Sequence, residues 1–202
     1  LYVPPPSAKY LATDGTRLIM AGAWESSASS GETTPATSRV WFTRPLGATD
    51  QGDDESITST ADSRYWIDID DPRGSGITAL HQIGGVVYVF FKESVWRLLA
   101  TGQSDTPYRS EQVSTSAGAI SQSATVVGQM PGSTEDAIYF VSVSGLYRIG
   151  SLGALEWLGR DVVPRNYSTY MTGIGLGYDS LRRDIWIFVT TGSAARFVIN
   201  VD

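Results

Sequence analysis

Apolar and polar positions alternate along this chain in short runs, at the two-residue period of β-strands. Runs rich in Val, Ile, Phe, Tyr and Trp are separated by polar corners, and no stretch beyond ten residues has the apolar spacing of an amphipathic helix. We therefore expect an all-β fold. The expected strands lie at 10–13, 17–21, 38–43, 65–70, 77–83, 87–98 (two strands), 123–128, 138–149 (two strands), 175–179, 185–189 and 196–199.

One strand pair is repeated. The stretch at 87–98 reappears at 138–149, and both copies read apolar, Tyr, two apolar residues, a polar corner, then apolar, aromatic, Arg, apolar. A related unit closes the chain at 175–199, and the strands at 10–43 form a divergent first unit. Strand-forming repeats of about 40 to 50 residues are typical of β-propeller blades. The sequence predicts a β-propeller of antiparallel blades, with about four blade-like modules that either form a small closed ring or belong to a larger one.

The pattern also predicts where the chain is covered and where it is exposed. The uninterrupted apolar run at 86–91 is expected to be an interior strand, buried on both faces. Gly145 is expected at a corner with positive φ. The small and polar segments 25–37 and 47–62 are expected to be exposed loops. We treat 1–202 as a single propeller domain or a fragment of one, since the sequence begins at Leu1 without an initiator Met.

Composition narrows the classes of function. The 202 residues have a formal net charge of −6, no Cys and one His. A disulfide framework and Cys-ligated zinc are excluded. The acidic balance argues against sequence-specific nucleic acid binding, which needs clustered Lys and Arg. No apolar run approaches the roughly 20 residues of a membrane-spanning helix.

Few residues suggest chemistry. His81 lies in a strand without a second His, so we expect a hydrogen-bonded structural role rather than catalysis. Asp68, Asp70 and Asp71 could in principle hold calcium or an acid/base pair, but a solvated strand end is the simpler interpretation. We therefore predict no catalytic residue, no metal, no cofactor and no enzymatic activity.

The residue sequence of these modules also resembles that of a known group of proteins. The segments at 38–43, 77–97, 116–121 leading into 138–148, and 175–188 resemble propeller proteins of tailed-bacteriophage virions, of the tail nozzle, tail hub and head-to-tail stabilisation type. The likeness covers residues 38 to 202 and is a pattern of strands and corners. It implies a structural virion protein of the neck or tail that forms part of the DNA ejection conduit. It also implies a homo-oligomeric ring, other neck and tail proteins as partners, and only non-specific passage of DNA.

Two groups of residues are the candidates for channel lining or interfaces. The first is an acidic loop, which would line or rim a channel and repel the phosphates of passing DNA. The second is a set of aromatic residues expected to be exposed, although packing between blades is the simpler role for most of them. The acids are Asp50, Asp53, Asp54 and Glu55; the aromatic residues are Trp24, Trp41, Trp157, Tyr167 and Tyr170.

Two other functions stay open. A carbohydrate- or host-receptor-binding propeller, extracellular or on a phage tail, would use the same exposed aromatics. A propeller glycoside hydrolase is the third possibility. Its only sequence support is Thr13-Asp14-Gly15-Thr16, a partial match to the turn of sialidase-like propellers in which Arg17 replaces the expected Trp.

Overall fold

The computed structural model describes residues 8–26, 33–45, 65–159, 173–189 and 195–200. For residues 23–26, 33–36, 159 and 195–197 it describes the backbone alone. The described residues form four antiparallel sheets in chain order, three with four strands and one with three. Sheet 1 contains β1 (Tyr10–Thr13), β2 (Leu18–Ser26), β3 (Thr33–Phe42) and β4 (Trp66–Asp68); sheet 2 contains β5 (Ile77–Ile83), β6 (Val86–Phe91), β7 (Val95–Ala100) and β8 (Tyr108–Ser114). Sheet 3 contains β9 (Thr125–Gln129), β10 (Asp136–Ser142), β11 (Gly145–Gly150) and β12 (Leu155–Gly159); sheet 4 contains β13 (Ile174–Asp179), β14 (Asp184–Val189) and β15 (Ala195–Asn200).

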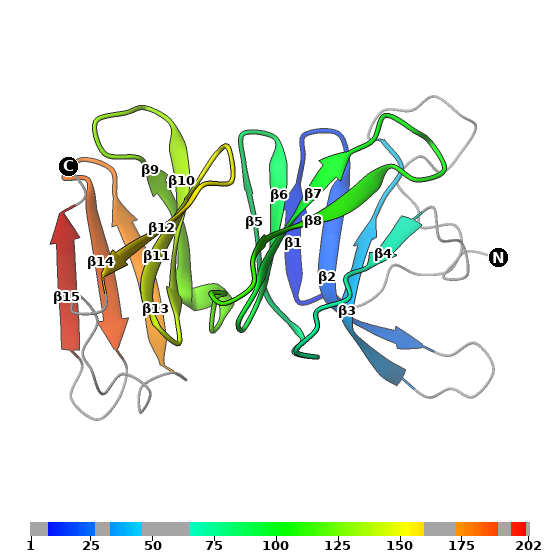
Figure 1. Cartoon of the computed structure of the whole chain (residues 1–202), viewed down its shortest axis with the longest axis horizontal. Coiled ribbons are helices and arrows are strands. Elements are labelled where there is room, and N and C mark those ends of the chain that lie inside the picture. Colours follow the sequence, from blue (N-terminus) through cyan, green and yellow to red (C-terminus); the bar gives the residue numbers. More distant parts are fainter. Residues whose placement is uncertain (1–7, 27–32, 46–64, 160–172, 190–194, 201–202) are drawn as a thin grey trace.

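The sheets stand side by side in a row (Figure 1), with sheets 1 and 4 at its two ends. Within each sheet, every strand pairs with its neighbours in sequence, so no strand crosses over another. A short 3₁₀ turn, η2 (Gln122–Ala124), leads into sheet 3. Within the described ranges, no helix is long and apolar enough to cross a membrane. The all-β prediction is confirmed.

Alternation along the second strand of a sheet serves two cores at once. In β6, the side chains of Val87, Val89 and Phe91 pack into the cluster shared with sheet 1. Tyr88 and Phe90 point the other way, into the cluster shared with sheet 3. Since successive side chains of a strand face opposite sides, an unbroken apolar run fills both cores. The prediction that this run is covered on both faces is confirmed, because the strand is buried from Val87 onward.

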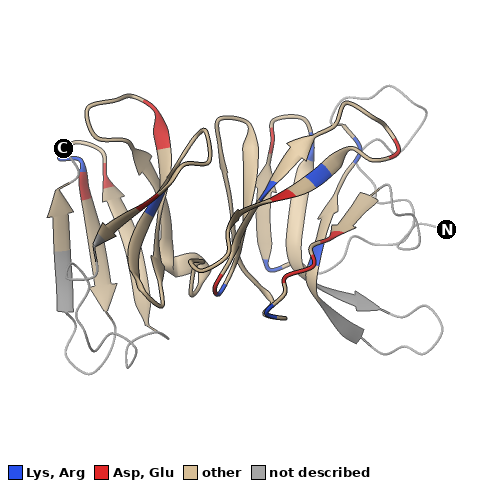
Figure 2. Ribbon diagram, viewed as in Figure 1, with Lys and Arg blue, Asp and Glu red and all other residues tan. Residues whose placement is uncertain are grey.

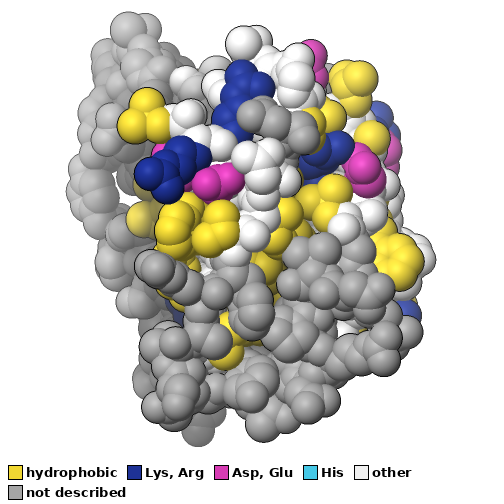
Figure 3. All heavy atoms as spheres, turned by 90° about the vertical axis from the view of Figure 1, so that its left-hand side faces the viewer, with side chains coloured by type: hydrophobic (Ala, Val, Ile, Leu, Met, Phe, Trp, Pro, Cys, Tyr) yellow, Lys and Arg dark blue, Asp and Glu magenta, His cyan; other side chains and the backbone are white. Residues whose placement is uncertain are grey.

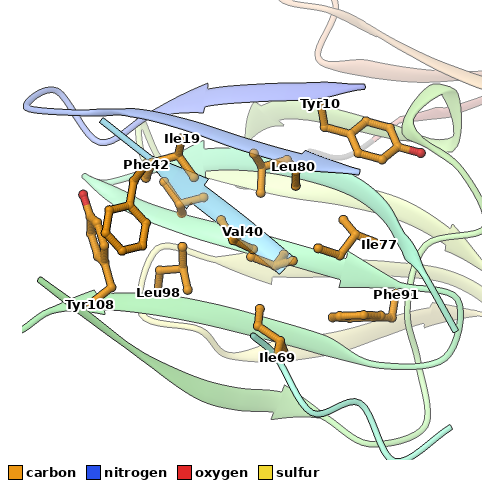
Figure 4. Packing of buried hydrophobic residues seen from close by; sticks show 13 residues of the cluster. Tyr10, Ile19, Val40, Phe42, Ile69, Ile77, Leu80, Phe91, Leu98 and Tyr108 are labelled. Carbon is orange, nitrogen blue, oxygen red and sulfur yellow. The ribbon is translucent and has the colours of Figure 1, made fainter. Parts of the chain in front are cut away.

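Figure 4 shows the first of these cores, between sheets 1 and 2. Ile19 and Val40 of sheet 1 meet Leu80 and Leu98 of sheet 2. At one side the rings of Phe42 and Tyr108 meet edge to face, with centroids 4.9 Å apart. Such contacts contribute roughly 0.5–1.5 kcal/mol beyond the buried area.

The second and third cores repeat this arrangement. Between sheets 2 and 3, Phe90 meets Phe140 in a T-shaped contact at 5.2 Å. Between sheets 3 and 4, Tyr139 and Val141 pack against Ile185, Ile187 and Val189. In keeping with these contacts, β5 and β6 carry no charged residue, whereas Lys, Arg, Asp and Glu lie in turns, at strand ends and on the later strands of each sheet (Figure 2). The clusters between the sheets therefore consist of aliphatic and aromatic side chains.

The structure differs from the sequence prediction in three places. Strands β8 and β12 were not expected. The expected loop at 25–37 overlaps two strands, because β2 extends to Ser26 and β3 begins at Thr33. Residues 27–32 lie outside the described residues. The expected loop at 47–62 lies outside them entirely. At the β10–β11 corner, Gly145 has φ of 136°, as expected.

Gly118 provides a test of the packing. It follows β8, and a Cβ atom built on it would lie 2.1 Å from the carbonyl oxygen of Phe91 and 2.6 Å from the backbone nitrogen of Ser94. Because both atoms belong to the backbone of the β6–β7 turn, Gly118→Ala forces that turn to shift and should destabilise the protein by roughly 1–3 kcal/mol. Thermal or urea unfolding measures the effect. Gly175→Ala is the matched control, since its nearest neighbouring atom is 3.8 Å away; equal stability of the two variants would contradict the close approach.

Candidate functional site

Several polar side chains of the described residues form hydrogen bonds at the boundaries between sheets. Sheet 2 has a row of three on its second, third and fourth strands. Tyr88 of β6 lies opposite Arg97 of β7, and Arg97 lies opposite Glu111 of β8. The guanidinium of Arg97 donates to Oε1 of Glu111 at 2.6 Å. Sheet 3 repeats the row with Tyr139, Arg148 and Glu156.

The row of sheet 2 holds the next sheet in place. Nη1 of Arg97 donates to the carbonyl oxygen of Leu152 at 3.1 Å. The hydroxyl of Tyr88 donates to the backbone carbonyl oxygen of Ser151 at 3.3 Å. Both acceptors lie in the β11–β12 turn. Gly153 is needed in this turn, because its φ of 84° is a conformation that residues with a Cβ atom rarely adopt. The Tyr and Arg of the first copy thus join two sheets, whereas in sheet 3 the hydroxyl of Tyr139 donates to the carbonyl oxygen of Gln129 and Arg148 pairs with Glu156, both within the sheet.

Sheet 4 departs from this row. Its β14 pairs Trp186 with Val198 of β15, at the positions where sheet 3 pairs Tyr139 with Arg148. The polar arginine is thereby replaced by an aliphatic residue. The outer face of the last sheet is apolar at the place where the earlier sheets are polar.

His81 belongs to a second polar cluster, between β5 and η2. The side-chain amide of Gln122 donates to Nε2 of His81 at 3.0 Å, and Thr125 Oγ1 lies within hydrogen-bonding distance of the same nitrogen. Gln122 also accepts from the backbone nitrogen of Leu80 at 2.9 Å. Burial lowers the pKa of His81 to about 4, so the ring is neutral at pH 7. The predicted structural role agrees with these partners, which join sheets 2 and 3.

Asp71 lies in a third cluster. Its carboxylate accepts from Ser94 Oγ at 2.8 Å and from Ser75 Oγ at 3.1 Å, and the residue is buried. The expectation that it is a solvated acid is therefore wrong, because hydroxyl groups replace water as its donors. Asp68, by contrast, is half-exposed and forms a bidentate ion pair with Arg39, at 2.6 and 2.8 Å, while Asp70 is exposed.

Asp14 occupies the turn that resembles a sialidase-type motif. Its Oδ1 accepts from the backbone nitrogens of Thr16 and Arg17, both at 2.8 Å, and its Oδ2 accepts from the hydroxyl of Tyr108. Burial alone would raise the pKa of Asp14, but the bonds from Tyr108 and Thr16 outweigh it and the pKa is lowered. The carboxylate shapes its turn and links sheet 1 to sheet 2.

The aromatic residues that were expected to be exposed differ in their actual exposure. Trp157, on β12, is 55% exposed. Trp41 is fully buried beside Met20 and Tyr65, so its expected exposure is wrong. The backbone of Trp24 lies in β2, and its side chain is outside the described set.

The remaining candidates cannot be placed in the fold. They lie outside the described residues and are Asp50, Asp53, Asp54, Glu55, Tyr167 and Tyr170. Among the residues that are described, no group of three or more His, Asp or Glu side chains is arranged to hold a metal ion. What the geometry offers is a set of contacts between sheets and exposed apolar side chains at the ends of the row.

Comparison with models of known protein families found no match, and none of the curated proteins compared is significantly similar to the chain.

The neutral His81 predicts a dependence of stability on pH. Its pKa is about 4 in the folded state, against about 6.5 in an unfolded chain. Below pH 6.5 the unfolded state takes up a proton that the folded state does not, so the free energy of unfolding falls as the pH is lowered, by up to about 3 kcal/mol near pH 4.

Urea unfolding between pH 7.5 and pH 4.5 measures this loss. His81→Gln removes the titrating group, so its stability should fall less over that range than that of the wild type. The carboxylates contribute equally to both proteins, and the difference between the two profiles isolates the histidine. Parallel profiles would show that His81 is not held neutral by burial.

Proposed function

We propose that this chain is a structural protein of a tailed-bacteriophage virion, a β-propeller subunit of the neck or tail that contributes to the DNA ejection conduit. One observation carries the proposal. The repeated phrases that resemble phage propeller proteins fall on equivalent strands, β6–β7 and β10–β11, with the same Tyr–Arg register pair, and the Tyr of each copy packs in the core shared with the following sheet.

The contacts between sheets support the propeller part of the proposal. The first strands of successive sheets contact one another: β1 with β5, β5 with β9, and β9 with β13. Blades around a common axis bring their first strands together in this way. The row of four sheets then corresponds to an arc of consecutive blades.

The polar chemistry described above supports a role without catalysis. The hydrogen bonds of His81, Asp71 and Asp14 are made with other parts of the fold. The acidic residues at 50–55 are proposed to line or rim the channel, where negative charge limits the adhesion of DNA phosphates. Rigidity and surface shape would then be the functional properties.

A carbohydrate- or receptor-binding propeller is the alternative, and one observation favours it. Trp157 is more than half exposed on the last strand of sheet 3, and an exposed indole ring is a common platform for sugars and protein partners.

The test is to locate the protein. Under the phage proposal, purified particles of the virus that encodes the chain contain it at a fixed copy number, detected by mass spectrometry. Electron cryomicroscopy then places its four sheets in a symmetric ring at the neck or tail. Particles that lack the protein would contradict the proposal. Binding to a glycan array that is lost in Trp157→Ala would favour the alternative.

A further inference from the structure

His81 lies at the boundary between sheets 2 and 3, on the first strand of sheet 2. Its ring meets the ring of Phe90 edge to face, with centroids 6.3 Å apart, and Phe90 belongs to the core shared with sheet 3. His81 is partly buried, and it does not appear on the sheet 4 end of the row, which faces the viewer in Figure 3. The one histidine of the chain is therefore placed between two sheets, within reach of protons from solvent.

Gln122 covers the edge of β5 with its side-chain amide. As the first strand of sheet 2, β5 pairs with none of the described strands along this edge. Oε1 of Gln122 accepts from the backbone nitrogen of Leu80 at 2.9 Å, and its Nε2 donates to the carbonyl oxygen of Leu80 at 3.4 Å. The amide thereby makes the two bonds that a neighbouring strand would make.

These two bonds fix the orientation of the Gln122 amide. Because the oxygen end faces the N–H of Leu80, the nitrogen end faces His81, with Nε2 of Gln122 3.0 Å from Nε2 of the ring. A donor points at this ring nitrogen, so the ring must present a lone pair there. The neutral ring does so when its proton is on Nδ1.

A second proton on the ring reverses this contact. When Nε2 of His81 is protonated, two donors face each other, and the Gln122 amide cannot turn over without placing its nitrogen against the N–H of Leu80. Thr125 offers an acceptor to the new proton, since its Oγ1 is within hydrogen-bonding distance of Nε2 and gives its own hydrogen to the carbonyl oxygen of Gln122 at 2.6 Å. The charged ring therefore keeps a partner, whereas Gln122 loses one.

Among the described residues, no charged group faces the ring from the elements packed against it. These elements are β6, η2, β9 and β10, while β1 and β2 contact the opposite face of β5, to which Leu80 points. Their titratable residues are Tyr88, Asp136 and Tyr139. Burial raises the pKa of Tyr88, which lies opposite His81 and stays neutral in acid; Asp136 is exposed at the first position of β10, and Tyr139 packs toward sheet 4. Burial without a carboxylate partner lowers the pKa of His81 to about 4.

The segment that carries Gln122 has separate attachments that do not titrate. The backbone nitrogen of Ile120 donates to a carbonyl oxygen of β10 at 3.1 Å, and the hydroxyl of Ser123 donates to one of β13 at 2.9 Å. These bonds hold the segment on sheets 3 and 4 when Gln122 leaves β5. The hydroxyl of Thr78 on β5 also donates to the carbonyl oxygen of Ala119 at 2.6 Å, so the opening is confined to the Gln122 end of the segment.

We propose that His81 and Gln122 form a proton-operated latch, in which protonation of His81 releases the Gln122 amide from Leu80 and opens the edge of β5 in acid, while the four sheets stay folded. The latch is distinct from the loss of global stability predicted above, because only the contact between η2 and β5 opens. It depends on the contacts of these described residues alone and not on a viral origin.

Hydrogen exchange of the Leu80 backbone amide, followed by NMR, reports the latch, because this N–H donates to Gln122. The protection factor, in which the intrinsic effect of pH on exchange is removed, measures the open population. The ring has a pKa of about 4 while the latch is closed and regains about 6.5 when it opens, so the protection factor of Leu80 should fall about twentyfold from pH 7 to pH 5.

Urea separates this local opening from unfolding of the whole chain. A local opening exposes little surface, so urea below the unfolding transition should leave the exchange of Leu80 nearly unchanged. Val89 is the reference, since it lies opposite Leu80 in β6 and is fully buried. Its amide should be better protected than that of Leu80 and should exchange faster as urea is added.

Two variants test the chemistry of the latch. His81→Gln does not titrate, so its Leu80 protection factor should be the same at pH 7 and pH 5. Gln122→Glu places a carboxylate, which only accepts, between the Leu80 N–H and the ring. Protonation of His81 then closes the contact, so the ring pKa measured by NMR should rise above that of the wild type and Leu80 should not lose protection in acid.

Three results would overturn the proposal. One is a wild-type Leu80 protection factor that does not change between pH 7 and pH 5. Another is equal protection and equal urea dependence for Leu80 and Val89, which would mean that the whole chain opens. The third is a fall in protection in acid that is as large in His81→Gln or Gln122→Glu as in the wild type. None of these results bears on whether the protein occurs in a virion, so the two proposals can fail separately.

Discussion

The structure depends on strands whose two faces are both apolar. In β6 and β10 nearly every side chain is buried, and alternate residues serve the cores on either side. Complete burial of a Val or Phe side chain contributes about 1.5–3 kcal/mol, so such a strand is stable only with a sheet against each face. A sheet of this kind cannot stand alone. The row of sheets is the solution that the chain adopts.

Polar groups are placed where they do not interrupt this stacking. The Arg97–Glu111 and Arg148–Glu156 pairs lie on the third and fourth strands of their sheets, and their partly exposed carboxylates keep contact with water. Exposed pairs of this kind contribute little to stability by themselves. Arg97 also has a positional role, because its bond to the backbone carbonyl of Leu152 holds the turn of the following sheet. His81 and Asp71 link neighbouring segments through hydrogen bonds in the same manner.

Much of the fold could be predicted from the sequence because alternation and the repeat are local signals. The strands at 77–98 and 138–149, the burial of 86–91 and the corner at Gly145 follow from them. Strand β8 was missed because Arg109, Glu111 and Gln112 make it polar, and its strand character comes from pairing with β7. The polar start of β3 was read as a loop for the same reason, since its pairing with β2 extends it.

The candidate site was less predictable than the fold. Asp71 accepts a hydrogen bond from Ser94, which lies 23 positions away in the sequence. No local sequence pattern predicts that contact. Trp41 was expected to be exposed because a tryptophan in a strand does not reveal which of its two faces is covered. Tyr88 and Arg97 belong to the recognised repeat, but their role between sheets depends on the turn at 150–153, which lies in the next module. Contacts between modules could not be predicted from local sequence patterns.

Native-state hydrogen exchange tests the stacking account most directly, at a protein concentration where the chain is monomeric. If the sheets stabilise one another through their shared faces, the central amides of β6 and β10 exchange only by opening of the whole chain. Their opening free energies are then equal and fall with the same slope as urea is added. Separate opening energies and slopes for β6 and β10 would mean that sheets 1 and 2 unfold independently of sheets 3 and 4, and would contradict the account.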